Sequence, residues 1–230
     1  MEKISLNNLV IETTRKCNMT CNHCLRGKSQ NKIMKTEHLK TLFSKLDCIS
    51  TITFTGGEPS LHPDIILETI EIAKKHSVDI GSFYIATNAK KISDEFLLAL
   101  CKLYLYCSDN EISQVQWSND LYHDEDNEHE KLKVFSFFSP RYSKEYPMKS
   151  DYLINEGNSE LNGMGSRNIE PETFEIDENN IIEGNVYLNC NGNLIAGCDF
   201  SYESQNKRSN IICKVEDFSL KAFERFTNTF

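Results

Sequence analysis

The chain contains 230 residues, of which 39% are hydrophobic and 26% are charged. This balance indicates a soluble globular domain with a buried core, and no apolar run approaches the roughly 20 residues that cross a bilayer. The net charge of −9 and a pI of about 5.2 argue against binding to a nucleic-acid backbone and leave a small nucleotide substrate open.

The first half of the chain alternates between strand and helix patterns. Strands are predicted where apolar and β-branched residues run together, at residues 9–11, 51–55, 80–87 and 112–118. Helices are predicted between them, over residues 36–46, 63–73 and 93–107. Such alternation indicates an α/β fold with parallel strands. Because a complete eight-unit barrel needs roughly 250 residues, we expect an open or partial barrel.

The second half of the chain does not continue this alternation of strands and helices. The acidic run at 119–130 is predicted to be a solvated loop, followed by a helical and then irregular segment at 131–147 and a strand at 152–154. A hairpin is predicted over 186–196, and a helix over 218–229 closes the chain. The expected domains are therefore a barrel at residues 1–170 and a C-terminal extension of hairpin and helix at residues 171–230, packed on the barrel.

Three of the nine cysteines, Cys17, Cys21 and Cys24, lie within eight positions after the first predicted strand. The N-terminus has no secretory pattern, so we expect a cytoplasmic location, where clustered cysteines indicate metal or redox chemistry. A structural zinc site has four ligands, and the fourth would be His23 or a distant residue. A cubane iron–sulfur cluster on three cysteines would leave one iron open, as catalysis requires. The spacing favours the cluster and leaves zinc as the alternative.

Two motifs together resemble the radical S-adenosylmethionine (SAM) superfamily. C-x3-C-x2-C after a first strand is similar to its signature, in which the position before the third cysteine is usually aromatic, as His23 is. Thr-Gly-Gly-Glu-Pro after the second strand resembles its GGE motif, which receives the methionine end of SAM. Gly56 and Gly57 would let the backbone approach the ligand. Glu58 would accept charge-assisted hydrogen bonds from the SAM ammonium group.

Further positions at strand ends match the superfamily less closely. Thr87 and Asn88 resemble part of a T-N-G strand end and are candidate polar groups of the SAM pocket. The resemblance places Ser118 near the SAM ribose, and directs Asp120 and His123 toward the substrate. A surface histidine is the alternative for His123.

The resemblance implies a partial (βα)6-type TIM barrel, a [4Fe–4S] cluster on the three clustered cysteines, and SAM bound to the open iron. An electron donor such as flavodoxin or ferredoxin would reduce the cluster. SAM would then be cleaved to methionine and a 5′-deoxyadenosyl radical, which would abstract hydrogen from a peptide or small-metabolite substrate. The alternatives are a glycyl-radical-enzyme activase, a 7-carboxy-7-deazaguanine synthase-like enzyme, or a non-enzymatic metal-binding module.

The tail resembles the start of the twitch/SPASM extension of peptide-modifying radical SAM enzymes, which binds auxiliary clusters. Five residues rather than four separate Gly192 from Cys198, and only Cys213 follows. We therefore expect a shortened, cluster-free hairpin, and leave open whether Cys190, Cys198 and Cys213 bind anything. Asn158 stands where relatives often have the arginine of a SAM-contacting segment.

Overall fold

One sheet organises the computed structural model, which describes residues 3–120, 122–123, 126–140 and 153–229. Its strands are β1 (Ile4–Thr14), β2 (Leu46–Gly56), β3 (Asp79–Thr87), β4 (Gln114–Trp117), β5 (Phe138–Pro140), β6 (Glu175–Ile176), β7 (Ile181–Leu188), β8 (Asn193–Ala196) and β9 (Ile211–Lys214). The strand order within these residues is β5-β4-β3-β2-β1-β7-β8-β9, and β6 pairs with β7.

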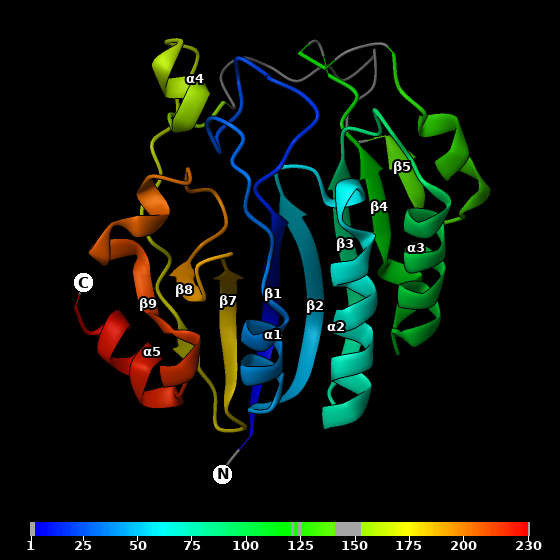
Figure 1. The fold of residues 1–230 in the computed structure, drawn as a ribbon. Coiled ribbons are helices and arrows are strands. Elements are labelled where there is room, and N and C mark those ends of the chain that lie inside the picture. The colour runs from blue at the N-terminus through cyan, green and yellow to red at the C-terminus, as the bar shows by residue number, and fades with distance from the viewer. Residues whose placement is uncertain (1–2, 121, 124–125, 141–152, 230) are drawn as a thin grey trace.

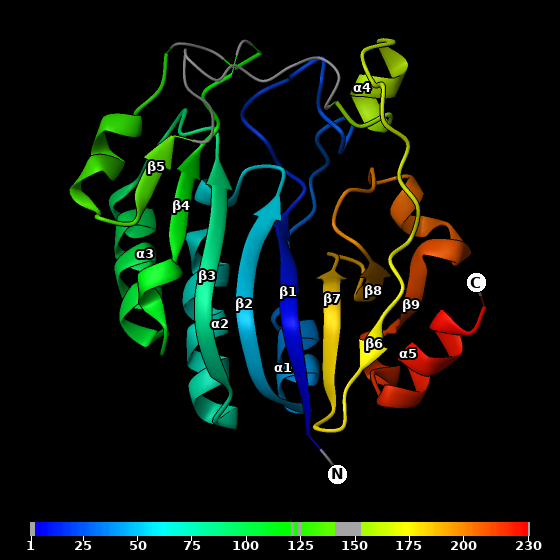
Figure 2. The ribbon, with the colours of Figure 1, turned by 180° about the vertical axis from the view of Figure 1, so that it is seen from behind.

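The six strands from β5 to β7 in this order are parallel to their neighbours. Since β5 and β7 lie at opposite ends of this series, the sheet stays open, which confirms the prediction of a partial barrel with parallel strands (Figures 1 and 2). Antiparallel pairing occurs at the β7 end, where β6 and β8 both pair with β7 and β9 pairs with β8.

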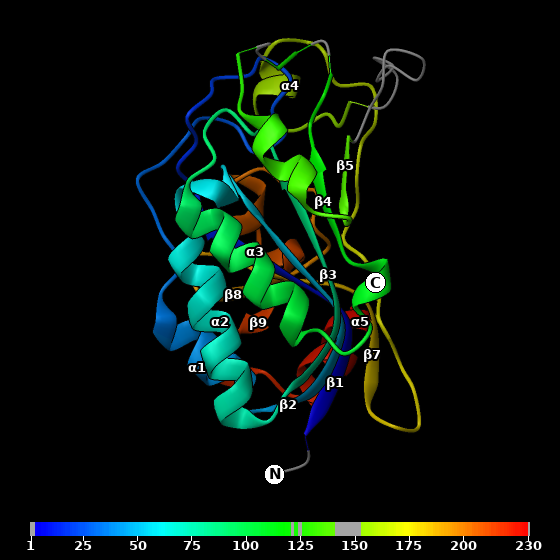
Figure 3. The same cartoon turned by 90° about the vertical axis from the view of Figure 1, so that its right-hand side faces the viewer.

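Three helices cover one face of the sheet (Figures 1 and 3). They are α1 (Thr36–Phe43), α2 (Pro63–His76) and α3 (Asp94–Tyr106). Pro63 begins α2, where its missing N–H leaves no helical bond unmade. Ser93 caps α3 by accepting a hydrogen bond from the backbone N–H of Phe96 at 3.2 Å. Two shorter helices, α4 (Gly157–Leu161) and α5 (Leu220–Thr227), lie near the cysteine segment and beside β9 respectively.

Alternate residues of the parallel strands face different surroundings. Leu9, Ile52 and Phe83 are fully buried or nearly so in the main core cluster, which also holds the apolar faces of α1, α2 and α3. Val10 and Tyr187 pack in a second cluster with residues of the C-terminal segment. This period of two is the reason the sheet can present one apolar face to the helices and a different face to the cavity described below.

The second half of the chain is less regular than the sequence pattern suggests. The hairpin is confirmed, since β7 and β8 pair antiparallel around residues 189–192. A 3-10 helix at His129–Val134 and strand β5 occupy part of the segment predicted as helical then irregular, and residues 141–152 lie outside the described residues. Ile154 forms only an isolated bridge with Arg167. The division at residue 170 stays a prediction, and β7 pairs directly with β1.

No helix in the described part of the chain is long and apolar enough to span a membrane.

The fold depends on the core between sheet and helices, and Phe54 on β2 is fully buried there. We expect Phe54→Ala to lower the free energy of unfolding by about 3–5 kcal/mol, because the substitution leaves a cavity. Leu105 on α3 is 80% exposed, so Leu105→Ala should change it by less than about 0.5 kcal/mol. Urea unfolding of both variants measures the difference, and equal stabilities would contradict this assignment of the core.

Candidate functional site

A cavity of about 970 Å³ lies at the carboxyl ends of the first four strands. In parallel α/β folds this edge collects the loops that bind ligands. Its wall includes every residue that the sequence predicts for the site, namely Cys17, Cys21, His23, Cys24, Gly56, Gly57, Glu58, Thr87, Asn88, Ser118, Asp120 and His123. The fold therefore gathers segments that are up to about a hundred residues apart in sequence.

The cysteine segment leaves the end of β1 and turns twice. The backbone N–H of Cys24 donates to the carbonyl of Cys21, and that of Gly27 donates to the carbonyl of Cys24, both at 3.3 Å. The three thiols are half-buried, and burial raises the pKa of Cys17 to about 11. All three thiols line the cavity.

The two glycines of the GGE motif bring the end of β2 against the start of the cysteine segment. Gly57 donates its N–H to the carbonyl of Thr14 at 2.7 Å, and Glu58 donates its N–H to the carbonyl of Lys16 at 2.9 Å. A Cβ on Gly57 would lie 2.1 Å from the Lys16 oxygen. Gly56 has a φ of +131°, and its Cβ would lie 2.1 Å from the Thr14 oxygen. The glycines thus allow the two motifs to pack backbone against backbone.

The Glu58 carboxylate joins the ends of β2 and β3. It is 2% exposed and accepts hydrogen bonds from Ser60 N at 3.0 Å, Thr87 Oγ1 at 2.6 Å and Asn88 N at 2.9 Å. Sequence reasoning assigned this side chain to the SAM ammonium group. The structure adds that both of its oxygens already hold protein donors, so the carboxylate also positions the polar strand end at 87–88.

Asn88 connects that strand end to the cysteine segment. Its Nδ2 donates to Asn18 Oδ1 at 2.9 Å and lies 3.8 Å from Cys17 Sγ. The next residue, Ala89, has a φ of +52° and is held by a hydrogen bond from its N–H to Thr87 Oγ1 at 3.0 Å. A left-handed alanine costs roughly 1–2 kcal/mol, so the surrounding contacts hold this turn in place.

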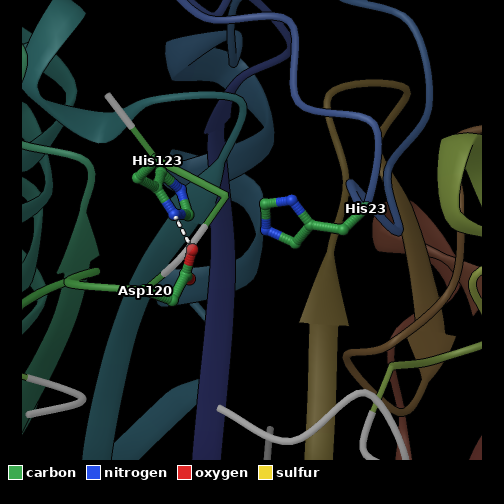
Figure 4. Close-up of side chains that lie close together, drawn as sticks. All are labelled: His23, Asp120 and His123. Carbon is green, nitrogen blue, oxygen red and sulfur yellow. Dashed lines mark hydrogen bonds and ion pairs between the residues drawn. The ribbon is translucent and has the colours of Figure 1, made fainter. Parts of the chain in front are cut away.

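His23, Asp120 and His123 converge across the cavity (Figure 4). His123 Nδ1 lies 2.7 Å from Asp120 Oδ1, and the His23 ring points toward this pair, 5.1 Å from the His123 ring. Burial lowers the pKa of His23. Burial alone would raise the pKa of Asp120, but the hydrogen bond and charge of His123 outweigh it and lower that pKa. The site therefore presents an ionised carboxylate that orients an imidazole, a pairing suited to proton transfer.

Residues from the second half of the chain hold the cysteine segment from its other side. Asn158 donates from its backbone N–H to the carbonyl of Cys24 at 2.9 Å and from Nδ2 to the carbonyl of Cys21 at 3.0 Å. Arg26 donates from Nη1 to the carbonyl of Phe200 and from Nη2 to the carbonyl of Cys198, both at 2.6 Å. Asn158, where the sequence resemblance places a SAM-contacting arginine, thus bonds to the backbone of the cysteine segment.

Four buried side-chain polar atoms in the described part of the chain have no hydrogen-bond partner. Within the described residues they are His23 Nδ1, Trp117 Nε1, Ser159 Oγ and Tyr202 OH. Ser159 follows Asn158, and Tyr202 donates its backbone N–H to the carbonyl of Arg26 at 3.1 Å. A buried polar atom without a hydrogen bond costs about 1–3 kcal/mol. Of the four residues, only His23 lines the cavity.

Sequence reasoning missed the part of the cavity that the sheet itself forms. Asn8, Thr53 and Tyr84 line it from β1, β2 and β3, and Asn8 Oδ1 accepts a hydrogen bond from Thr53 Oγ1 at 3.3 Å. The available signal was the alternation of polar and apolar residues within these strands. Arg26, Arg167, Cys198 and Asp199 also line the cavity. Arg26 lies two residues after Cys24, whereas Arg167, Cys198 and Asp199 reach the cavity through long-range packing that leaves no local signal.

The three cysteines of the tail lie in different surroundings. Cys190 is buried and donates to the carbonyl of Glu12 at 3.3 Å, Cys198 faces the cavity, and Cys213 lies on β9. Within the described residues their sulfur atoms are not part of a set of three or more ligand atoms lying within 4.8 Å of one another.

Comparison with known proteins gives the following matches. The family model described as the radical SAM superfamily matches residues 11–113. The uncharacterized protein MJ0907 of Methanocaldococcus jannaschii is 29% identical over 94 residues, which are 39% of this chain and 33% of that protein. The match thus spans about a third of the length of this curated relative.

Two solved structures share the fold. The structure of anSMEcpe with bound AdoMet has a TM-score of 0.57 at 16% identity, and that of anSMEcpe with bound AdoMet and Cp18Cys peptide has 0.57 at 15%. Each comparison covers 98% of this chain and 82% of the other. At this identity the likeness establishes the arrangement of strands and helices.

The close approach of Gly57 to the Lys16 carbonyl can be tested by substitution. We expect Gly57→Ala to separate the two motifs, because its Cβ would overlap the Lys16 carbonyl, and to lower stability by about 1–3 kcal/mol. Iron bound after anaerobic reconstitution should fall several-fold. Gly163 has a φ of +63° and open space where a Cβ would lie, so Gly163→Ala is the matched control, with a cost of about 1 kcal/mol and normal iron binding. Equal iron contents would contradict the prediction.

Proposed function

We propose, from the radical SAM domain that residues 11–113 form, that this enzyme holds a [4Fe–4S] cluster on Cys17, Cys21 and Cys24 and uses SAM to abstract hydrogen from a peptide or small metabolite. The superfamily's cofactors are a [4Fe–4S] cluster and SAM, which together supply a 5′-deoxyadenosyl radical when bound and reduced. The protein's part is to bind, orient and shield.

One observation carries this proposal. The cysteine segment and the GGE motif share a cavity wall and are joined by backbone hydrogen bonds from Gly57 and Glu58 to residues 14–16. The sequence left a non-enzymatic metal-binding module as an alternative. Such a module would not require the cysteine segment to contact the GGE motif. Three cysteines that line one cavity together with the GGE motif support a cluster with an open coordination position.

We assign the remaining predicted residues by their place in the cavity. Thr87, Asn88 and Ser118 lie on the strand-end wall as candidate SAM contacts, and His23 lies between the cysteines and the Asp120–His123 pair. The carboxylate of Asp120 orients the His123 imidazole toward the substrate side, where it accepts or returns a proton.

The wall formed by the sheet bears on the substrate. Asn8, Thr53 and Tyr84 make this part of the wall polar without charge, and hydrogen bonds to Asn185 and Gln116 hold Asn8 and Tyr84 in place. Such a wall suits a neutral, hydrogen-bonding substrate region, as a peptide backbone provides. A cytoplasmic electron donor such as flavodoxin or ferredoxin completes the proposal.

Two related activities would be distinguished by their reactants. A glycyl-radical-enzyme activase would act on a large protein partner and produce a glycyl radical signal in electron paramagnetic resonance (EPR). A 7-carboxy-7-deazaguanine synthase-like enzyme would consume carboxy-tetrahydropterin. Incubating the reconstituted enzyme with each candidate reactant, SAM and dithionite separates these activities from modification of a peptide.

Cluster ligation is tested at Cys24. We expect Cys24→Ala to abolish 5′-deoxyadenosine formation from SAM and dithionite after anaerobic reconstitution, because the cluster loses one of three ligands. Cys101 is exposed on α3 and does not line the cavity, so Cys101→Ala should match the wild type. Chromatographic quantification of deoxyadenosine gives the result. A wild-type yield from Cys24→Ala would refute the assignment.

Proton transfer is tested at the Asp120–His123 pair. We expect His123→Ala and Asp120→Asn to slow substrate conversion roughly 100-fold, the usual scale of general acid–base catalysis. His129 stacks on Trp117 and does not line the cavity, so His129→Ala should retain the wild-type rate. An unchanged rate in both variants of the pair would contradict the acid–base role.

Divalent-ion removal distinguishes proton transfer from metal binding at the same residues. The ligand atoms of His23, Asp120 and His123 lie within 4.8 Å of one another, so they are also able to hold a metal ion after small movements. We expect dialysis against EDTA, with the iron–sulfur cluster retained, to leave the conversion rate unchanged. If the conversion rate falls and added Mn²⁺ or Zn²⁺ restores it, the three residues bind a metal ion and the acid–base role is wrong.

A further inference from the structure

The stretch of chain around the three cysteines differs in charge from the rest of the protein. Residues 13–36 contain none of the 34 acidic residues and six of the 25 basic residues. The six are Arg15, Lys16, Arg26, Lys28, Lys32 and Lys35. Because the whole chain has a net charge of −9, the remainder is more acidic still, and this stretch has the opposite sign.

Backbone pairing brings the two arms of this stretch side by side. The backbone N–H of Arg15 donates to the carbonyl of Lys32 at 2.8 Å. Next along the first arm, the backbone N–H of Cys17 donates to Ser29 Oγ at 3.0 Å. Lys16 lies between these two contacts in sequence, and residues 28–32 lie opposite it. The basic residues of the two arms are therefore neighbours in the fold as well as in the sequence.

The lysines of this stretch point to solvent rather than into the cavity. We call them the basic surface, which comprises Lys16, Lys28, Lys32 and Lys35. Lys28 and Lys35 are exposed, and the other two are partly exposed. None of the four lines the cavity, and Figure 3 shows their segment, in blue, along an outer edge of the molecule.

The basic surface has little counter-charge of its own. In the part of the chain that the structure describes, Lys16, Lys28 and Lys35 form no ion pair and no side-chain hydrogen bond. Glu12, the acidic residue that precedes the stretch, is fully buried and paired with Arg15 at 2.6 Å. Positive charges held together in this way attract an oppositely charged partner and orient it on approach.

The position of the basic surface indicates what that partner brings. Lys16 precedes Cys17, and Ser29, which bonds to the backbone of Cys17, follows Lys28. The basic surface thus adjoins a proposed cluster ligand while staying outside the cavity. In the proposed function the cavity holds SAM and the substrate, so a protein that delivers electrons has to approach the cluster from outside it.

We propose that the basic surface docks an acidic one-electron carrier protein, which reduces the cluster across the cysteine segment. The carrier loses one electron, the cluster gains it, and no bond forms or breaks in either protein. Electron-transfer encounters are small and weak, so a few charges are enough to set the rate of productive association. The inference rests on the proposed function, because it requires a reducible cluster on the cysteines.

The test compares two reductants on the reconstituted, full-length enzyme supplied with SAM. One is a limiting amount of a reduced, acidic flavodoxin, and the other is saturating dithionite. The double substitution Lys28→Glu and Lys35→Glu should slow flavodoxin-driven formation of 5′-deoxyadenosine about ten-fold in dilute buffer, because it reverses the charge that the carrier meets. Salt added to about 0.5 M should remove most of this difference by screening. The dithionite-driven rate should equal that of the wild type.

A matched control reverses two lysines at the opposite edge of the sheet. Lys75 and Lys102 are exposed near the carboxyl ends of α2 and α3, away from the cavity (Figure 1). The double substitution Lys75→Glu and Lys102→Glu should retain the wild-type rate with both reductants. Carbodiimide, which joins a lysine to a carboxylate in contact with it, should cross-link flavodoxin to the basic surface of the wild type, as mass spectrometry of the digested adduct would show.

Three results would overturn the inference. They are an unchanged flavodoxin-driven rate in the Lys28 and Lys35 variant, an equal slowing in the control variant, and an equal slowing with dithionite. The first is also the result expected if the basic surface bound an acidic segment of a peptide substrate instead of the carrier. A wild type that forms no deoxyadenosine with dithionite would overturn the proposed function itself, so the two failures are distinguishable.

Discussion

Two backbone hydrogen bonds, from Gly57 to Thr14 and from Glu58 to Lys16, hold together the motifs on which the site depends. They form only because neither Gly56 nor Gly57 carries a Cβ at the point where the two chain segments meet. The other contacts of the site build on this one. The cysteine segment is aligned with the end of β2, Glu58 ties that end to β3, and Asn88 returns from β3 to the cysteine segment. Hydrogen bonds thus connect the cysteine segment, the end of β2 and the end of β3 in a closed loop.

The C-terminal segment completes the same wall from the opposite side. Arg26 and Asn158 bond across it, and the paired Arg15 and Glu12 lie fully or almost fully buried beneath it. A buried ion pair offers modest net stability, but the loss of one partner is costly, so such a pair favours one specific arrangement of its neighbours. Here those neighbours include Tyr187, Cys190 and the ring of Tyr202. The second half of the chain therefore contributes to the wall of the cavity as well as extending the sheet.

The sequence predicted the parts of the molecule whose signals are local. Strand and helix alternation, the Pro63 start of α2 and the Ser93 cap depend on neighbouring residues, and the structure shows each of them. The segment after Asp120 was harder to read, because short strands such as β5 carry little periodicity and derive their place from the neighbouring strand. Asn158 illustrates the same limit within the site: its sequence position suggested a cofactor contact, whereas its hydrogen bonds join two distant segments of backbone.

By itself the sequence determined the chemistry that is available: three thiols at a spacing that leaves out a fourth ligand, paired glycines before a glutamate, and an aspartate and a histidine shortly after the fourth predicted strand. Tertiary structure decided how these groups meet. The end of β2 lies against the cysteine segment, and the Glu58 carboxylate is shared between two strand ends. Arg26 bonds to the carbonyl groups of Phe200 and Cys198, more than 170 residues away in sequence. The physical reason is that backbone approach and burial depend on atoms far apart in the chain, whose proximity no local pattern records.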